Sequence, residues 1–280
     1  MNKQPIFSLL ESSPNLYHTF FIGDGQLVYD HKDADTVLWG HWDHNASADL
    51  IKSSMSEIEG GSIADVGTCT GWFSHLFESM GADVEAIDMF DRNERYMMHT
   101  AMGCSHSFVL KNIYQLNQMN KEYDYVWSQD VFCHLENPLL AMRNIRSVCR
   151  KKVFIATDKI VPDINDITVQ ARWPTFDFNS ICHYHNDAYT FSYSYEFMRT
   201  MFNNCGFKNP SIKFSYRTLA GNKLGRFKNC KVSDEKKQEF GRDIVVWEAE
   251  VDETKTAFPE HKKLDHTLDH RNYIGEPLYR

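Results

Sequence analysis

The residue types best suited to chemistry in this chain are two carboxylates and two glycines placed around an apolar run. Asp65 lies within the run 63–66, and a loop containing Gly67 and Gly71 follows it. Glycine lets the backbone approach a ligand without a Cβ, and the next helix begins with free N–H groups. Asp88 ends a second apolar run, and a carboxylate about 20 residues beyond the first glycine of such a loop can accept hydrogen bonds from a ribose diol. This spacing predicts a nucleoside site, although an ordinary strand-to-helix turn would also use two glycines.

The elements that must position these residues follow from the hydrophobic pattern. Short apolar runs alternate with stretches whose apolar residues recur at helical spacing. The predicted strands are 63–66, 83–88, 107–110, 123–128 and 153–157, and the predicted helices are 45–59, 72–80, 93–102, 138–148 and 192–204. This alternation predicts an α/β fold with a Rossmann-like parallel sheet, and strands at 210–218 and 243–251 predict an antiparallel pair at its end.

Several polar residues stand at the carboxyl ends of the predicted strands. Right-handed crossovers place the carboxyl ends of parallel strands along one edge of a sheet. We therefore expect the loop from Gly67, Asp88, Asn112 and Gln129 to converge at that edge. Open α/β sheets bind their ligands there.

The first predicted helix, 45–59, carries clear local signals. Asn45 or Ser47 is expected to cap its N-terminus. Its apolar face is expected to consist of Leu50, Ile51, Met55 and Ile58.

Segments outside the alternation predict the domain organisation. Residues 1–45 are rich in aromatic residues and histidine and predict an extension packed on a domain that spans 46–251. Within that domain, 158–190 lacks clear periodicity, as lids and binding insertions commonly do. Residues 252–280 are polar and predict a peripheral tail.

Composition narrows the class of protein. The chain has 280 residues, a formal net charge of -8 and seven scattered cysteines without a C-x-x-C pair. The charge gives no general attraction to nucleic acid or acidic membranes. The cysteines indicate a reduced protein without a disulfide framework, and no membrane span or signal peptide is evident. We expect a cytoplasmic protein.

Three motifs together resemble the class I S-adenosylmethionine-dependent methyltransferases. They are Asp65-Val66-Gly67-Thr68-x-x-Gly71-Trp72-Phe73-Ser74, then Gly81-Ala82 before a strand ending in Ile87-Asp88, then His134-Leu135-x-x-Pro138-Leu139. Within that class the chain is most similar to the group that includes the bacterial tRNA wobble-uridine 5-oxyacetic acid synthase. The likeness covers about residues 15–160. It departs at Cys133, where that tRNA enzyme has a tyrosine before the histidine, and at Cys69, where a glycine is common.

The resemblance implies S-adenosylmethionine as the cofactor and a set of residues around it. Asn112 and Ile113 would meet the adenine, or else form a loop residue and its packed neighbour. The full implied cofactor set is Asp65, Gly67, Thr68, Cys69, Gly71, Asp88, Met89, Asn112, Ile113 and Gln129.

Methyl transfer to an O–H or N–H group needs alignment and a proton acceptor. His134, His183 and His185 are the candidates because histidine titrates near neutral pH. For each of them a role in the helix start or in a solvated loop is the alternative. No metal is assigned, although the alternating His183, His185 and Asp187 would suit a metal if they lay on a strand.

Three functions remain open at this point. The aromatic insertion and the acidic balance favour methylation of an O or N atom of a small molecule. The alternatives are a tRNA wobble-uridine (carboxy)methyltransferase and a non-catalytic nucleoside-binding module. A small-molecule partner is expected in preference to nucleic acid, no membrane partner is expected, and the oligomeric state is not predicted.

Overall fold

The computed structural model describes residues 42–44, 47–158, 169–172, 190–220 and 242–258, and the statements below concern these residues. They form one eight-stranded sheet with the order β1-β9-β10-β6-β5-β2-β3-β4. The bounds are β1 Trp42–Asp43, β2 Ser62–Val66, β3 Asp83–Asp88, β4 Ser107–Leu110, β5 Tyr123–Gln129, β6 Cys149–Asp158, β9 Phe207–Ala220 and β10 Arg242–Val251.

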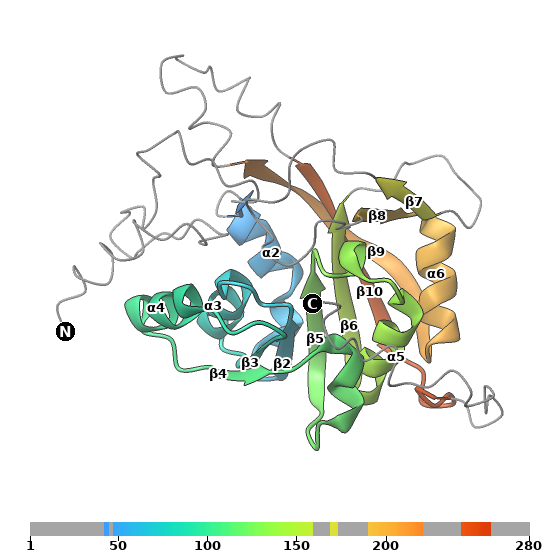
Figure 1. Cartoon of the computed structure of the whole chain (residues 1–280), viewed down its shortest axis with the longest axis horizontal. Coiled ribbons are helices and arrows are strands. Elements are labelled where there is room, and N and C mark those ends of the chain that lie inside the picture. The colour runs from blue at the N-terminus through green and yellow to red at the C-terminus, as the bar shows by residue number, and fades with distance from the viewer. Residues whose placement is uncertain (1–41, 45–46, 159–168, 173–189, 221–241, 259–280) are drawn as a thin grey trace, which may run out of the picture.

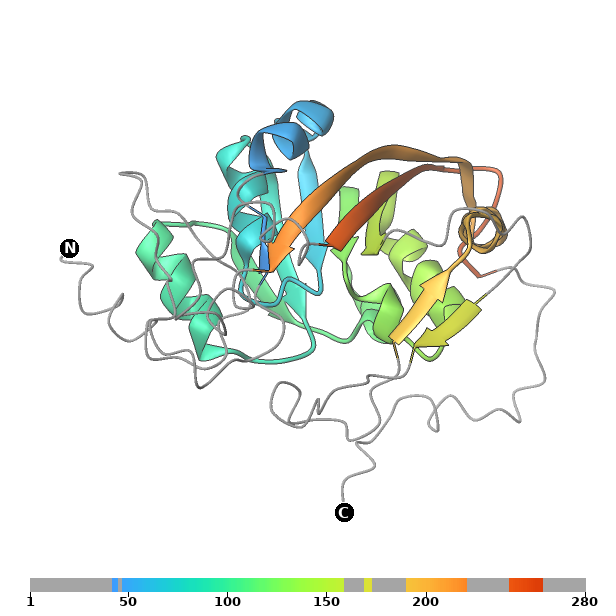
Figure 2. The ribbon, with the colours of Figure 1, turned by 90° about the horizontal axis from the view of Figure 1, so that it is seen from above.

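The sheet has the mixed topology that the sequence predicts. The five strands from β2 to β6 that belong to the main sheet pair in parallel, whereas β10 pairs antiparallel with both β6 and β9. Figure 2 shows β9 and β10 as long curved neighbours. The strand order reverses between β2 and β5, which leaves their carboxyl ends at a topological switch point. The Rossmann-like α/β prediction is confirmed.

Helices cover both faces of the sheet (Figure 1). One hydrophobic cluster packs residues of α2, α3 and α4 against the sheet, and a second packs η3, α5 and α6. The bounds are α2 Ala48–Ser54, η2 Ser56–Ile58, α3 Trp72–Ser79, α4 Asn93–Met102, η3 Ile113–Gln118, η4 Phe132–His134, α5 Pro138–Val148 and α6 Tyr195–Asn204.

Strand β6 shows why its sequence is a continuous apolar run. Val153 and Ile155 belong to one cluster, whereas Phe154 and Ala156 belong to the other. Successive side chains of a strand point to opposite faces, so a strand covered on both sides must be apolar at every position.

The N-terminal part corrects two local expectations. Ser47 occupies the N-cap position of α2 but makes no capping hydrogen bond; its Oγ donates to the carbonyl of Arg217 on β9 instead. The contact with β9 outweighs the local cap. Leu50 is 44% exposed, whereas Ile51, Met55 and Ile58 are buried as expected. Asn45 and nearly all of the predicted extension lie outside the described residues.

The predicted insertion 158–190 is described only in part. Its strand β7 (Val169–Arg172) pairs antiparallel with β8 (Thr190–Tyr193), which begins at the last residue of the insertion; the aperiodic sequence did not indicate this strand pair. Figure 2 shows this yellow pair outside the main sheet. The Tyr193 hydroxyl donates to the carbonyl of Phe132, 2.8 Å away, so β8 lies against η4 at the carboxyl end of β5.

Candidate cofactor and acceptor site

The loop after β2 is held tightly against its neighbours. The Gly67 and Thr68 amides both donate to the carbonyl of Ile87 at the end of β3, at 2.8 and 3.1 Å. Gly67 has φ +83°, and a Cβ there would lie 2.1 Å from Cγ2 of Val131, in the loop after β5. Only glycine permits this conformation together with this contact. The two loops therefore meet at the topological switch point.

Asp88 links the end of β3 to the same loop. Its Oδ2 accepts from the Cys69 amide at 2.8 Å, and its Oδ1 accepts from the Phe90 amide at 3.0 Å. Cys69 adopts φ +53°, which is uncommon for a residue other than glycine. A carboxylate offers about four lone-pair sites, so each oxygen keeps a site for a ribose hydroxyl. Burial raises the pKa of the Cys69 thiol to about 12, which keeps it protonated.

Asp65 is buried beneath the loop and supports it. Ser74 Oγ donates to Asp65 Oδ2 at 2.6 Å, and Thr68 Oγ1 lies 2.7 Å from Ser74 Oγ. Burial raises the pKa of Asp65 to about 6, and the charge of Asp88 adds to that rise, while the hydrogen bonds from Ser74 and Thr68 oppose it. The carboxyl group thus connects the end of β2 to the first turn of α3.

Arg95 completes this cluster from α4. Its Nη2 donates to the carbonyl of Phe90 at 2.7 Å, and its Nη1 lies 3.8 Å from Asp88 Oδ2. Its guanidinium carbon lies 3.5 Å from the centroid of the Phe108 ring on β4. Burial lowers the pKa of Arg95, whereas the nearby Asp88 raises it. Arg95 therefore fixes the turn that carries Asp88.

The residues expected around the adenine lie beside Asp88 but differ in exposure. Met89 is 51% exposed, whereas Ile113 is buried in the core. The Asn112 side chain caps η3 by accepting from the Tyr114 amide at 3.0 Å. We call β2, β3 and β4 with the loops that follow them the cofactor half of the site.

A second group of residues surrounds the carboxyl end of β5, and we call it the acceptor half. The Tyr216 hydroxyl on β9 donates to Gln129 Oε1 at 2.6 Å, and Gln129 Nε2 lies 3.4 Å from Nε2 of the buried His44. The His44 ring packs on Trp72 and Phe73 at the start of α3. His134 is exposed at the end of η4, in the same region. His183 and His185 lie outside the described residues.

Some residues of the site could not be read from the sequence. Ser74 lies in the first turn of α3 and is part of the first motif, but no residue pattern indicates that its hydroxyl contacts Asp65. Three contacts join residues of separate elements, and only the fold brings them together. Arg95 lies near Asp88, Val131 lies against Gly67, and Tyr216 bonds to Gln129.

Comparisons with known proteins agree with this geometry. Residues 64–157 match the family model of a methyltransferase domain, a span that begins in β2 and ends in β6. The N-terminal domain of EvdMO1, crystallised with S-adenosylhomocysteine, has a similar fold with a TM-score of 0.59 at 11% identity, over 90% of this chain and 98% of that one. The YcgJ protein from Bacillus subtilis gives a TM-score of 0.51 at 13% identity, over 75% of this chain and 100% of that one. No curated protein gave a significant match.

The family match, the strand order and the loop–carboxylate arrangement together define a class I methyltransferase domain. The chain is an S-adenosylmethionine-dependent methyltransferase, and S-adenosylmethionine is its cofactor. The class predicted from the motifs is confirmed; the comparisons do not single out the tRNA wobble-uridine group. Among the described residues, no helix combines the length and apolar character needed to cross a bilayer.

Proposed function

We propose that the enzyme methylates an O or N atom of a small molecule bound beside the carboxyl end of β5. S-adenosylmethionine supplies the methyl group. In this proposal Asp88 holds the ribose, the loop 67–71 holds the methionine portion, and Met89 and Ile113 border the adenine.

The observation that carries the proposal is the buried hydrogen-bonded chain Tyr216–Gln129–His44. Its members come from β9, from β5 and from the segment after β1, and His44 packs against the first residues of α3, which follow the cofactor loop. A polar chain in such a place can orient a small polar acceptor. The exposed His134 is our candidate for the proton acceptor, and His183 and His185 remain proposals of the same kind.

Charge placement supports a small acceptor over RNA. The basic run 150–152 lies near the start of β6, at the opposite end of the strands from the cofactor loop. Arg150 and Lys151 are paired there with Asp124, at 3.1 and 3.3 Å. RNA binding relies on Lys and Arg side chains that contact the phosphate backbone, and among the described residues this basic run lies away from the cofactor loop. The net charge of -8 also opposes a polyanion.

A labelling experiment tests the acceptor class. The full chain is incubated with S-adenosylmethionine carrying a tritiated methyl group, with either a deproteinised small-molecule extract or purified total RNA. We expect label in the low-mass fraction and none in RNA, and much less transfer by Asp88→Ala at limiting cofactor. Label in RNA would overturn the proposal in favour of a tRNA-type substrate. Label in neither fraction, with normal cofactor binding by calorimetry, would also overturn it.

A further inference from the structure

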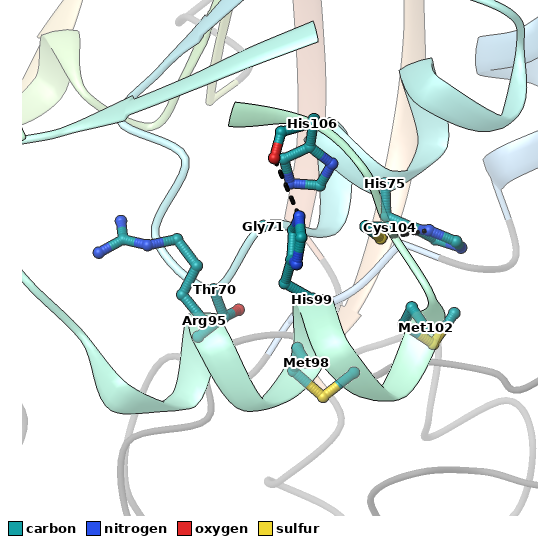
Figure 3. Close-up of a pocket in the computed structure, with 9 residues that line it drawn as sticks. All are labelled: Thr70, Gly71, His75, Arg95, Met98, His99, Met102, Cys104 and His106. Carbon is teal, nitrogen blue, oxygen red and sulfur yellow. Dashed lines mark hydrogen bonds between the residues drawn. The ribbon is translucent and has the colours of Figure 1, made fainter. Parts of the chain in front are cut away.

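A separate cluster of ionisable side chains lies between α3 and the segment that joins α4 to β4. His75 and Glu78 stand three residues apart on α3 and so share one face of the helix. Cys104 and His106 stand two residues apart before β4. None of these four residues belongs to the cofactor or acceptor half. Figure 3 shows the His75 and Cys104 side chains meeting and His106 nearby.

The donor atoms of this cluster are close together. His106 Nδ1 donates to Glu78 Oε2 at 2.6 Å, and His75 Nδ1 lies 3.2 Å from Cys104 Sγ. One donor atom each from Glu78, Cys104 and His106 all lie within 4.8 Å of one another. Two ligands of a tetrahedral zinc ion lie about 3.4 Å apart at ordinary Zn–N, Zn–O and Zn–S distances. Small side-chain movements would therefore bring these three donors to zinc spacing, and His75 Nδ1, which contacts Cys104 Sγ, is the available fourth donor.

Two further features suit an ion site. His75, Cys104 and His106 line a common cavity of about 10 Å³, close to the smallest that holds one water molecule. Surrounding groups also hold the donors in place. Glu78 Oε1 accepts from both the amide and the hydroxyl of Ser105, which leaves Oε2 facing the cluster. His99 Nε2 donates to the His106 carbonyl at 2.9 Å and fixes the segment. Such outer contacts orient ligands in known metal sites.

We propose that His75, Glu78, Cys104 and His106 bind a zinc ion that ties α3 to the segment before β4. Imidazole nitrogen, thiolate sulfur and carboxylate oxygen are the ligand types that zinc accepts. On binding, zinc takes the place of the proton on His106 Nδ1, and Nε2 of the same ring takes up a proton from solvent, so that the imidazole stays neutral. The Nδ1 proton and the proton of the Cys104 thiol are released to solvent.

The ion would also help to hold the cofactor loop in place, because one of its ligands is hydrogen-bonded to that loop. The His75 amide donates to the carbonyl of Gly71, the last residue of that loop, at 3.0 Å. Thr70 and Gly71 line the same cavity as three of the proposed ligands. No metal is predicted from the sequence, and the other possible metal ligands, His183, His185 and Asp187, lie outside the described residues. The sequence does not indicate the four-residue cluster, because His75 and Glu78 lie on α3 whereas Cys104 and His106 lie in the segment before β4.

Metal binding itself tests this site, independently of activity. Full-length protein without an affinity tag is stripped with a chelator and titrated with zinc against a chromophoric competitor, then with cobalt(II). We expect one tightly bound zinc per chain and a cobalt spectrum with a thiolate charge-transfer band and intense tetrahedral d–d bands. Cys104→Ser should abolish the charge-transfer band and weaken zinc binding at least tenfold. Glu78→Gln should weaken zinc binding while keeping the band.

Cys149→Ser is the matched control, because its buried thiol donates to the Lys152 carbonyl in β6, away from the cluster and the cofactor loop, and should leave zinc affinity and the cobalt band unchanged. Circular dichroism and S-adenosylhomocysteine binding confirm that each variant is folded. A protein that leaves all zinc with the competitor would show that the four side chains only hydrogen-bond to one another. A thiolate band that persists in folded Cys104→Ser would place the metal elsewhere. Either result overturns the proposal.

Discussion

The cofactor half and the acceptor half meet at one sheet edge but are built in different ways. The cofactor half is assembled from residues near in sequence, and its loop is fixed by backbone hydrogen bonds to Ile87 and by the carboxylates of Asp65 and Asp88. The acceptor half joins Gln129 to side chains far away in the chain, His44 and Tyr216. In the proposed function, a cofactor common to a whole class is thus held by a motif of residues near in sequence. The part that would choose the acceptor depends on distant contacts and can vary without disturbing that motif.

The largest expected effect comes from the contact that joins the two halves. Gly67→Ala forces a Cβ to within 2.1 Å of Val131 Cγ2 and keeps an L-residue at φ +83°. The two costs together should lower the free energy of unfolding by about 3 kcal/mol. Urea denaturation measures this loss. Adding Val131→Ala to Gly67→Ala should restore the part of the unfolding free energy that the clash removes. If the double variant is no more stable than Gly67→Ala, the two loops are not in contact.

A pH-dependent effect is expected from Asp65 in the cofactor half. Its pKa is raised from the ordinary 3.8 to about 6 in the folded protein, so between these values the folded state binds a proton that the unfolded state has lost. Its contribution to stability is fully present below about pH 4 and is lost as the pH rises through about 6. Relative to Asp65→Asn, the parent should therefore lose about 2.5 kcal/mol of unfolding free energy between pH 4 and pH 7.5. Urea titrations of both proteins across this range measure it, and a constant difference would contradict the buried carboxyl.

Asp88 should affect cofactor affinity in particular. Asp88→Ala removes a charged acceptor for the ribose and also frees the Cys69 and Phe90 amides. We expect a loss of about 1.5–3 kcal/mol in binding free energy for S-adenosylhomocysteine, measured by calorimetry. Asp88→Asn keeps an acceptor and should lose less. Equal affinity in parent and Asp88→Ala would exclude this residue from the ribose site.

The smallest effect on stability, and the sharpest separation of the two halves, comes from Tyr216. Tyr216→Phe removes the hydroxyl that donates to Gln129, at a cost of about 1 kcal/mol in unfolding free energy. Turnover should fall while S-adenosylhomocysteine affinity stays at the parent value. Tyr125→Phe is the control, because that hydroxyl donates to the Glu57 carbonyl, away from the site, and turnover should persist. If both variants behave alike, the Tyr216–Gln129 contact has no role in the acceptor half.

The fold and the cofactor half could largely be predicted because their signals are local. Strands β3 and β4 and helix α4 have the predicted bounds. The spacing of apolar residues, and the Gly and Asp residues at the ends of elements, are properties of neighbouring residues and can be read along the chain. Asp88 was expected at the edge for the same reason. The predicted capping hydrogen bond of Ser47 in α2 is absent, because the Ser47 hydroxyl donates to the carbonyl of Arg217, 170 residues away on β9. Local propensity gives way when a tertiary contact satisfies the same side chain.

By itself, the sequence determined the α/β class and the alternation of strands and helices that makes the sheet parallel, because both follow from the spacing of apolar residues. It also determined the glycine loop and the second carboxylate, because these lie within single strand–loop–helix units. Only the tertiary structure decided which side chains complete the site. Val131 closes on Gly67, Arg95 pairs with Asp88, and Tyr216 reaches Gln129 across the sheet. The same holds for the cluster of His75, Glu78, Cys104 and His106. These contacts join separate elements, and their distances are set by how helices and strands pack, which no spacing along the chain records.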